Sequence, residues 1–202
     1  MNARPGSRLI HCLVGALLLT SPGLLLSAPV NAKAESLPST GDSFTLTAHD
    51  GSRFESDRLK GKIVLLYFGF TSCPDVCPLE LSNIGRALHA LPDDQVTGLF
   101  VTIDPSRDTV ERLASYVTFF HPDLIGLTGT EEEIREVANQ YNISYRRIEQ
   151  GTSYTMEHPA NVYVLDPEGT IRAMAPFGST SEHLVRLVRG IAADSAAMSG
   201  QD

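Results

Sequence analysis

A predicted strand leads directly into a cysteine-bearing turn in the stretch that decides the fold, IVLLYFGFTSCPDVCP at residues 63–78. Residues 63–68 form a continuous apolar run, which is typical of a strand buried on both faces of a sheet. Residues 78–91 then place apolar side chains at helical spacing. The stretch therefore predicts a strand, a turn with two cysteines and a helix, in that order.

The segments on either side alternate between strand and helix patterns. Alternation implies parallel neighbouring strands, and a terminal hairpin adds an antiparallel edge. We therefore predict an α/β chain with a thioredoxin-like fold, in which helices flank both faces of a central mixed sheet. In chain order, the expected elements are a hairpin at 44–54, the strand at 63–68, a helix at 78–91, a strand at 96–103, a helix at 108–120, a strand at 124–127, a helix at 130–141, a hairpin at 161–175 and a last helix from 179.

Composition excludes several classes of protein. The chain has 202 residues, of which 42% are hydrophobic and 20% are charged, as in an average globular protein. These values exclude a fully disordered chain and a membrane protein with several spans. The 16 basic and 24 acidic residues give a formal charge of -8. No nucleic-acid partner is expected, because such binders need a positive surface.

The first 32 residues are not expected to belong to the fold. Arg4 and Arg8 precede an apolar run at 9–26, and small residues follow up to Ala32. This is the order of a secretory signal peptide, although an uncleaved N-terminal membrane anchor has similar features. In both cases the arginines stay inside, so the globular part lies outside the cytoplasm, in a bacterial periplasm, either soluble or anchored in the inner membrane. Loss of residues 1–32 would change the formal charge from -8 to -10, because it removes two arginines and no acidic residue.

The rest of the chain divides into three parts. Residues 33–40 are polar and small, and are interpreted as a tether. Residues 41–191 form the predicted thioredoxin-like domain. Residues 192–202 are rich in Ala, Ser and Gly and lack large apolar side chains, so we expect a flexible tail.

Two of the three cysteines lie together at the start of the predicted helix. Cys73 and Cys77 are four residues apart, which places both sulfurs on one helix face with Cβ atoms about 5–6 Å apart. A modest adjustment would close a disulfide between them, and two thiolates could instead bind one metal ion. The free N–H groups at a helix start favour the thiolate. A purely stabilising disulfide gains little from so short a loop, which leaves a redox pair and a metal site as the main alternatives.

One of the six histidines is expected to approach this pair. His158 precedes the strand expected from 161, and in a thioredoxin-like sheet the loop before this strand packs against the cysteine-bearing turn. Two thiolates and one imidazole are a soft, three-coordinate ligand set, which favours Cu(I) or Cu(II) over zinc. The other histidines either leave with the signal segment or have structural explanations; they are His11, His49, His89, His121 and His183.

Two acidic residues lie near the same edge of the predicted sheet. Asp104 follows a predicted buried strand, where it could support the site from behind the ligands. Asp108 is explained as the cap of the next helix. Neither is expected to bind a metal ion.

The cysteines and the histidine belong to three blocks through which the chain resembles the SCO/SenC family of copper-binding, thioredoxin-fold proteins, over about residues 41–190. The blocks are YFGFTSCPDVCP at 67–78, VTIDPSRDT at 101–109, and YTMEH at 154–158 followed by YVLDP at 163–167. Two residues depart from the family pattern: Glu157 stands where Asp is frequent, and Pro159 stands where Ser or Thr is frequent. Pro159 restricts His158 to extended backbone geometry.

The resemblance implies that Cys73, Cys77 and His158 bind copper. It further implies a role in building the dinuclear copper centre of cytochrome c oxidase, at the outer face of the cytoplasmic membrane. The implied partners are the oxidase subunit that carries this centre, other copper chaperones and thiol reductants.

The leading interpretation is thus a copper chaperone, which is a binding protein and not a catalyst. The alternative is an extracytoplasmic thiol–disulfide oxidoreductase. In that case one of Cys73 and Cys77 attacks a disulfide as a thiolate, and the other resolves the mixed disulfide. The alternative function needs no histidine, so His158 discriminates between the two.

Overall fold

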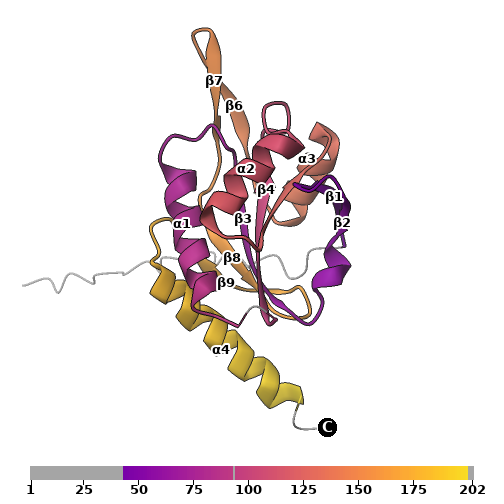
Figure 1. Ribbon diagram of the computed structural model, residues 1–202, viewed down its shortest axis with the longest axis vertical. Coiled ribbons are helices and arrows are strands. Elements are labelled where there is room, and N and C mark those ends of the chain that lie inside the picture. Colours follow the sequence, from indigo (N-terminus) through magenta and orange to yellow (C-terminus); the bar gives the residue numbers. More distant parts are fainter. Residues whose placement is uncertain (1–42, 93, 200–202) are drawn as a thin grey trace, which may run out of the picture. The chain divides into compact units, whose positions relative to one another are not determined.

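The apolar run of residues 63–68 lies in β3 (Ile63–Gly69), a central strand of a seven-stranded mixed sheet (Figure 1). The structure is a computed structural model and describes residues 43–92 and 94–199. The strand order is β2-β1-β5-β4-β3-β8-β9. β3 pairs with β4 in parallel and with β8 antiparallel, and every one of its residues is buried, as the unbroken apolar run predicts. The other strands of this sheet are β1 (Thr45–Ala48), β2 (Arg53–Glu55), β4 (Val96–Thr102), β5 (Leu124–Thr128), β8 (Val162–Leu165) and β9 (Ile171–Ala175).

Helices cover both faces of this sheet. α1 (Val76–His89) contacts α2 (Val110–Phe120) and α4 (Ser181–Ser199), and these three helices share one face. α3 (Glu131–Gln140) lies on the other face. Two neighbours on β3 mark the two sides: the Tyr67 hydroxyl reaches Cys77 of α1, whereas the Phe68 ring packs on Tyr141 at the end of α3. A short 3-10 helix, η1 (Ser56–Leu59), connects β2 to β3. The predicted α/β architecture is confirmed.

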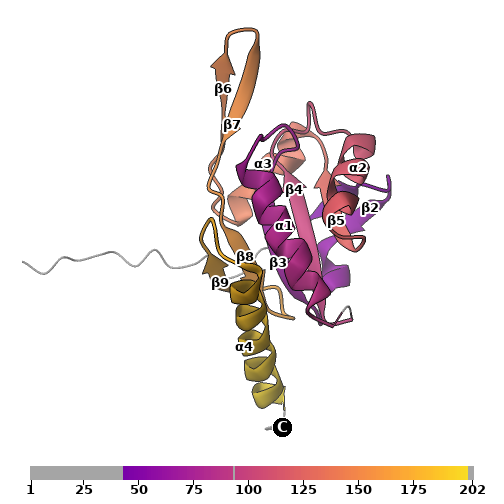
Figure 2. The same cartoon turned by 60° about the vertical axis from the view of Figure 1, so that its left-hand side comes forward.

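A second, two-stranded sheet was not expected from the sequence. β6 (Arg146–Gln150) and β7 (Ser153–Glu157) form an antiparallel hairpin that projects beyond the central sheet (Figures 1 and 2). Gly151 closes its turn with a φ of 62°, a left-handed conformation that favours glycine. His158 follows β7 directly, so this hairpin determines where His158 lies.

The C-terminal segment is helical up to Ser199, whereas the N-terminal segments are outside the described residues. α4 continues to Ser199, through most of the segment 192–202 that was expected to be flexible. Ala192, Ala193, Ala196 and Ala197 explain the difference, because alanine has the highest helix propensity. The signal peptide or anchor at 1–32 and the tether at 33–40 lie outside the described residues. Within residues 43–92 and 94–199, no helix combines the length and apolar composition needed to cross a membrane.

Candidate metal centre

The two cysteines lie at the junction between β3 and α1. Cys73 is partly exposed in the loop after the strand, and Cys77 is fully buried as the second residue of α1. The backbone N–H of Cys77 donates to the Cys73 sulfur at 3.4 Å. Both residues are free thiols in this structure, so the disulfide between them stays a prediction. Their proximity at the mouth of the sheet agrees with the strand–turn–helix order of the sequence.

The two thiols have opposite pKa shifts. A hydrogen bond from the Cys77 thiol, supported by backbone N–H groups at the helix start, lowers the pKa of Cys73 to about 5. Donation of that hydrogen bond, together with burial, raises the pKa of Cys77 above its ordinary value. At neutral pH the pair therefore holds one thiolate, on the accessible Cys73, and one thiol, on the buried Cys77.

His158 approaches the pair from the end of β7. Its Nε2 lies 3.9 Å from the Cys77 sulfur, and its Nδ1 lies 2.9 Å from the carbonyl oxygen of Pro159. A carbonyl oxygen only accepts hydrogen bonds, so Nδ1 carries the proton and the Nε2 lone pair faces the sulfur. Burial lowers the pKa of His158, which favours the neutral imidazole. A neutral imidazole with its other nitrogen fixed is the state that binds metal ions.

The separation of sulfur and nitrogen suits a shared metal ion. Bonds of about 2.3 Å to sulfur and about 2.0 Å to nitrogen span the observed 3.9 Å at an angle of about 130°. That angle is close to the trigonal arrangement of a three-coordinate ion. Among the described residues, however, no three His, Cys, Asp or Glu side chains already form a set that could hold a metal ion. Binding of one ion by all three side chains therefore requires them to rearrange.

Apolar side chains enclose the three candidate ligands. Cys73 and His158 line an open pocket of about 450 Å³. The rings of Tyr67 and Phe70 lie edge-on to His158, with centroid distances of 6.4 and 6.0 Å. Apolar walls lower the local dielectric constant and strengthen electrostatic interactions at the sulfurs. The further apolar lining is Pro74, Val76, Ile148, Met156, Ala160 and Phe177.

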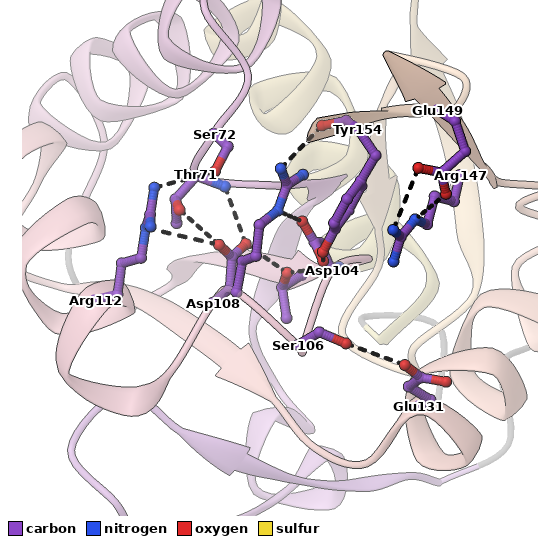
Figure 3. Close-up of polar contacts among 12 residues, drawn as sticks. Thr71, Ser72, Asp104, Ser106, Asp108, Arg112, Glu131, Arg147, Glu149 and Tyr154 are labelled. Atoms are coloured by element: carbon purple, nitrogen blue, oxygen red, sulfur yellow. Dashed lines mark hydrogen bonds and ion pairs between the residues drawn. The ribbon is translucent and has the colours of Figure 1, made fainter. Parts of the chain in front are cut away.

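A buried carboxylate holds the loop that leads to Cys73. Asp108 has no exposed surface and accepts hydrogen bonds from the Thr71 N–H at 2.9 Å, the Thr71 hydroxyl at 2.5 Å and the Thr102 hydroxyl at 2.6 Å. Figure 3 shows Thr71 directed at this carboxylate. Asp108 thus fixes the cysteine loop to the end of β4.

The prediction that Asp108 caps the next helix is wrong. Thr109 is the N-cap of α2, and its hydroxyl accepts the backbone N–H of Arg112 at 3.3 Å. Once Thr109 has taken the capping position, the preceding side chain points into the protein, where Thr71 and Thr102 satisfy it.

A second polar network anchors the hairpin that carries His158. The Tyr154 hydroxyl donates to Asp104 at 2.9 Å (Figure 3). Arg107 pairs with Asp104 and also donates to the Tyr154 carbonyl, at 2.9 Å. The guanidinium carbons of Arg107 and Arg147 lie 3.7 and 3.6 Å from the centroid of the Tyr154 ring. Asp104 therefore supports the site indirectly, as the sequence suggested.

Arg107 and Tyr154 lie within the sequence blocks quoted for the family resemblance, but the sequence analysis assigned neither of them a role. Their hydrogen bond joins residues 47 positions apart, and nothing local in either segment indicates it.

The four remaining histidines of the described residues make their contacts elsewhere: His49 accepts the Gly126 N–H, His89 packs on His121, and His183 contacts Arg186.

Comparison with known proteins finds relatives that match most of this chain. A profile of the SCO1/SenC family matches residues 32–193. A SCO2-like protein of Rickettsia conorii is 35% identical over 185 residues, which cover 87% of this chain and 90% of that protein. A crystal structure of Arabidopsis thaliana ScoI with copper bound is 38% identical, with a TM-score of 0.70, and the match covers 75% of this chain and 98% of that one.

A more distant structure describes a disulfide switch in BsSco, a member of the Sco family of cytochrome c oxidase assembly proteins. It is 21% identical with a TM-score of 0.60, and the match covers 76% of this chain and 93% of that one. At this identity the likeness supports the fold alone. Together with the closer structure, it confirms the thioredoxin-like fold predicted from the sequence.

Proposed function

This chain belongs to the SCO1/SenC family, and from that premise we propose that it is a copper chaperone whose ligands are the thiolates of Cys73 and Cys77 and the imidazole of His158. The observation that carries the proposal is the orientation of His158. Its Nδ1 is held by the Pro159 carbonyl, while Nε2 faces the Cys77 sulfur at 3.9 Å. A merely structural histidine has no need to direct a free lone pair at a thiol.

The chemistry of the ligands selects copper. Thiolates prefer Cu(I), and two thiolates with one imidazole also accept Cu(II). Structural zinc normally takes four protein ligands, whereas three candidate ligands converge here. The copper bound in Arabidopsis ScoI supports the same choice.

The delivery target is the dinuclear copper centre of cytochrome c oxidase. The Sco family is described as assembling this oxidase, and we assign the same role to this chain. The partner is then the oxidase subunit that carries the centre, met outside the cytoplasm. Cys73 is the more accessible of the two sulfurs, so it is the ligand that the receiving protein contacts first.

A copper titration of the reduced protein tests the ligand set. We expect one copper per chain, and a loss of affinity of at least about 100-fold in Cys73→Ala, Cys77→Ala and His158→Ala, because each removes a direct ligand. His183→Ala is the matched control, since His183 lies in the first turn of α4. Unchanged copper affinity in His158→Ala would overturn the three-ligand proposal.

A second function rests on a different observation, the unequal thiols. An accessible thiolate beside a buried thiol is the arrangement of a thiol–disulfide oxidoreductase. Under this alternative, Cys73 attacks a disulfide and Cys77 resolves the product. Oxidase assembly in cells that carry His158→Ala, combined with its loss in Cys77→Ser, would favour this function over copper delivery.

A further inference from the structure

A tyrosine hydroxyl contacts the Cys77 sulfur from inside the core. Tyr67 has no exposed surface, and its hydroxyl lies 3.5 Å from the sulfur of Cys77. This sulfur is the one hydrogen-bond partner that the hydroxyl has among the described residues. The ring is fixed by stacking on Phe100 at a centroid distance of 6.2 Å and by the edge contact with His158 at 6.4 Å. The hydroxyl therefore stays directed at the sulfur.

The value of this contact depends on the state of the sulfur. In the reduced pair the Cys77 sulfur lies beside the hydroxyl at 3.5 Å, whereas closing a disulfide draws that sulfur toward Cys73, to an S–S distance of about 2.0 Å. A disulfide sulfur carries no charge, so a buried hydroxyl that faces it is poorly satisfied and costs free energy. The contact thus favours reduced over oxidised sulfur.

We propose that Tyr67 sets the reduction potential of the Cys73–Cys77 pair, holding it toward the dithiol state. The redox effect itself requires no copper; its consequence, that more of the protein remains able to bind copper, rests on the proposed function. Tyr67 forms no bond in the reaction and acts only through its hydrogen bond to a reacting sulfur.

The equilibrium that Tyr67 shifts can be measured with glutathione. Oxidation of the pair, the Cys73 thiolate and the Cys77 thiol, breaks one S–H bond and forms one S–S bond between Cys73 and Cys77. Glutathione disulfide accepts the two electrons and its S–S bond breaks; two reduced glutathione molecules form, one with the proton of Cys77 and one with a proton from the solvent. Mixtures of reduced and oxidised glutathione thus give the equilibrium constant directly, with the free thiols of the full chain counted by mass spectrometry after alkylation.

The test variant is Tyr67→Phe, which removes the hydroxyl and keeps the ring. We expect the equilibrium to move toward the disulfide by about tenfold, which corresponds to a potential about 30 mV lower. Tyr116→Phe is the matched control: its ring also packs on Phe100, at 5.7 Å, but its buried hydroxyl has no hydrogen-bond partner in the described part of the chain. The control should leave the equilibrium unchanged.

A second substitution at the same position keeps the proposal testable if Tyr67→Phe fails to fold. Incorporation of 3-fluorotyrosine at position 67 keeps the hydroxyl and makes it a stronger donor, so the equilibrium should move in the opposite direction, toward the dithiol. An equilibrium within twofold of wild type in both substituted proteins, or equal shifts in Tyr67→Phe and Tyr116→Phe, would overturn the proposal. Failure of copper binding would show only in the copper titration, so the two outcomes are distinguishable.

Discussion

Asp108 and Thr71 are joined by two hydrogen bonds, from the backbone N–H and the hydroxyl of Thr71 to the two oxygens of one fully buried carboxylate. Thr71 lies two residues before Cys73, so this contact fixes the start of the cysteine loop. The same carboxylate accepts the Thr102 hydroxyl at the end of β4. The position of Cys73 is thereby tied to two central strands of the sheet.

Asp108→Asn should destabilise the protein by about 2–4 kcal/mol, because an amide offers one acceptor oxygen and directs an N–H group at donors that are already in place. Urea unfolding measures the loss. Glu132→Gln, at an exposed position of α3, is the control and should change the stability by less than about 0.5 kcal/mol. Equal unfolding midpoints for wild type and Asp108→Asn would contradict the role assigned to this carboxylate.

Arg107→Ala should lower copper affinity by about 10- to 100-fold, the usual effect of removing a group that orients a metal ligand. Its guanidinium fixes Tyr154 of β7 and hence the position of His158. Competition against a chelator of known affinity measures the change. Arg53→Ala removes an exposed ion pair with Glu133 and should leave the affinity unchanged.

The Arg107 effect should disappear in a protein that already carries His158→Ala. Residues that act through one another are not additive. If Arg107→Ala lowers copper affinity as much in that background as in wild type, Arg107 does not act through the histidine.

Cys73 should react with iodoacetamide with a pH profile centred near 5. Its pKa is lowered to about 5, and only the thiolate is nucleophilic. The rate should therefore rise up to about pH 6 and then level off, whereas an ordinary cysteine continues to gain rate past pH 8. Buried Cys77, with its raised pKa, should remain unlabelled. Mass spectrometry of peptides labelled between pH 4 and 8 distinguishes the two sites, and a profile still rising at pH 8 for Cys73 would refute the shift.

Two helical glycines should respond in opposite directions to alanine. A Cβ at Gly85 of α1 would lie 2.5 Å from the Phe120 carbonyl oxygen, whereas one at Gly190 of α4 would meet nothing within 4 Å. Gly190→Ala should stabilise the protein by about 0.5–1 kcal/mol through helix propensity. Gly85→Ala should destabilise it by about 1–3 kcal/mol, because α1 and α2 must separate. Thermal unfolding of the two variants checks both signs, and equal shifts would exclude the close contact at Gly85.

Most strands and helices of the domain were predictable because their signals are local. The apolar run of β3 and the capping box of Thr130 and Glu133 each specify one element within a few residues, and both are present. His158 followed from topology, because the segment before β8 must meet the end of the neighbouring strand β3.

The parts that were missed depend on distant contacts or weak patterns. β6 is exposed at every position except Ile148, so it lacks the alternation that marks a strand. Asp108 has the sequence context of a helix cap, and only the fold shows that Thr71 and Thr102 surround it. The length of α4 was also underestimated from composition. The small residues that suggested a flexible tail include alanines, which have high helix propensity.

β3 is hydrogen-bonded to a strand on each side, whereas β6 and β7 pair only with each other. We therefore expect the backbone hydrogen bonds of β3 to open far less often than those of the hairpin. In deuterium oxide, the amide protons of β3 should be replaced only when the whole domain unfolds, while those of the β6–β7 hairpin should be replaced through local opening. Cys73 and Cys77 follow the slow element and His158 follows the fast one. If His158 binds copper as proposed, it would be the ligand that detaches and rebinds within one lifetime of the folded domain, and the hairpin, not the sheet, would set the rate at which the ion is released.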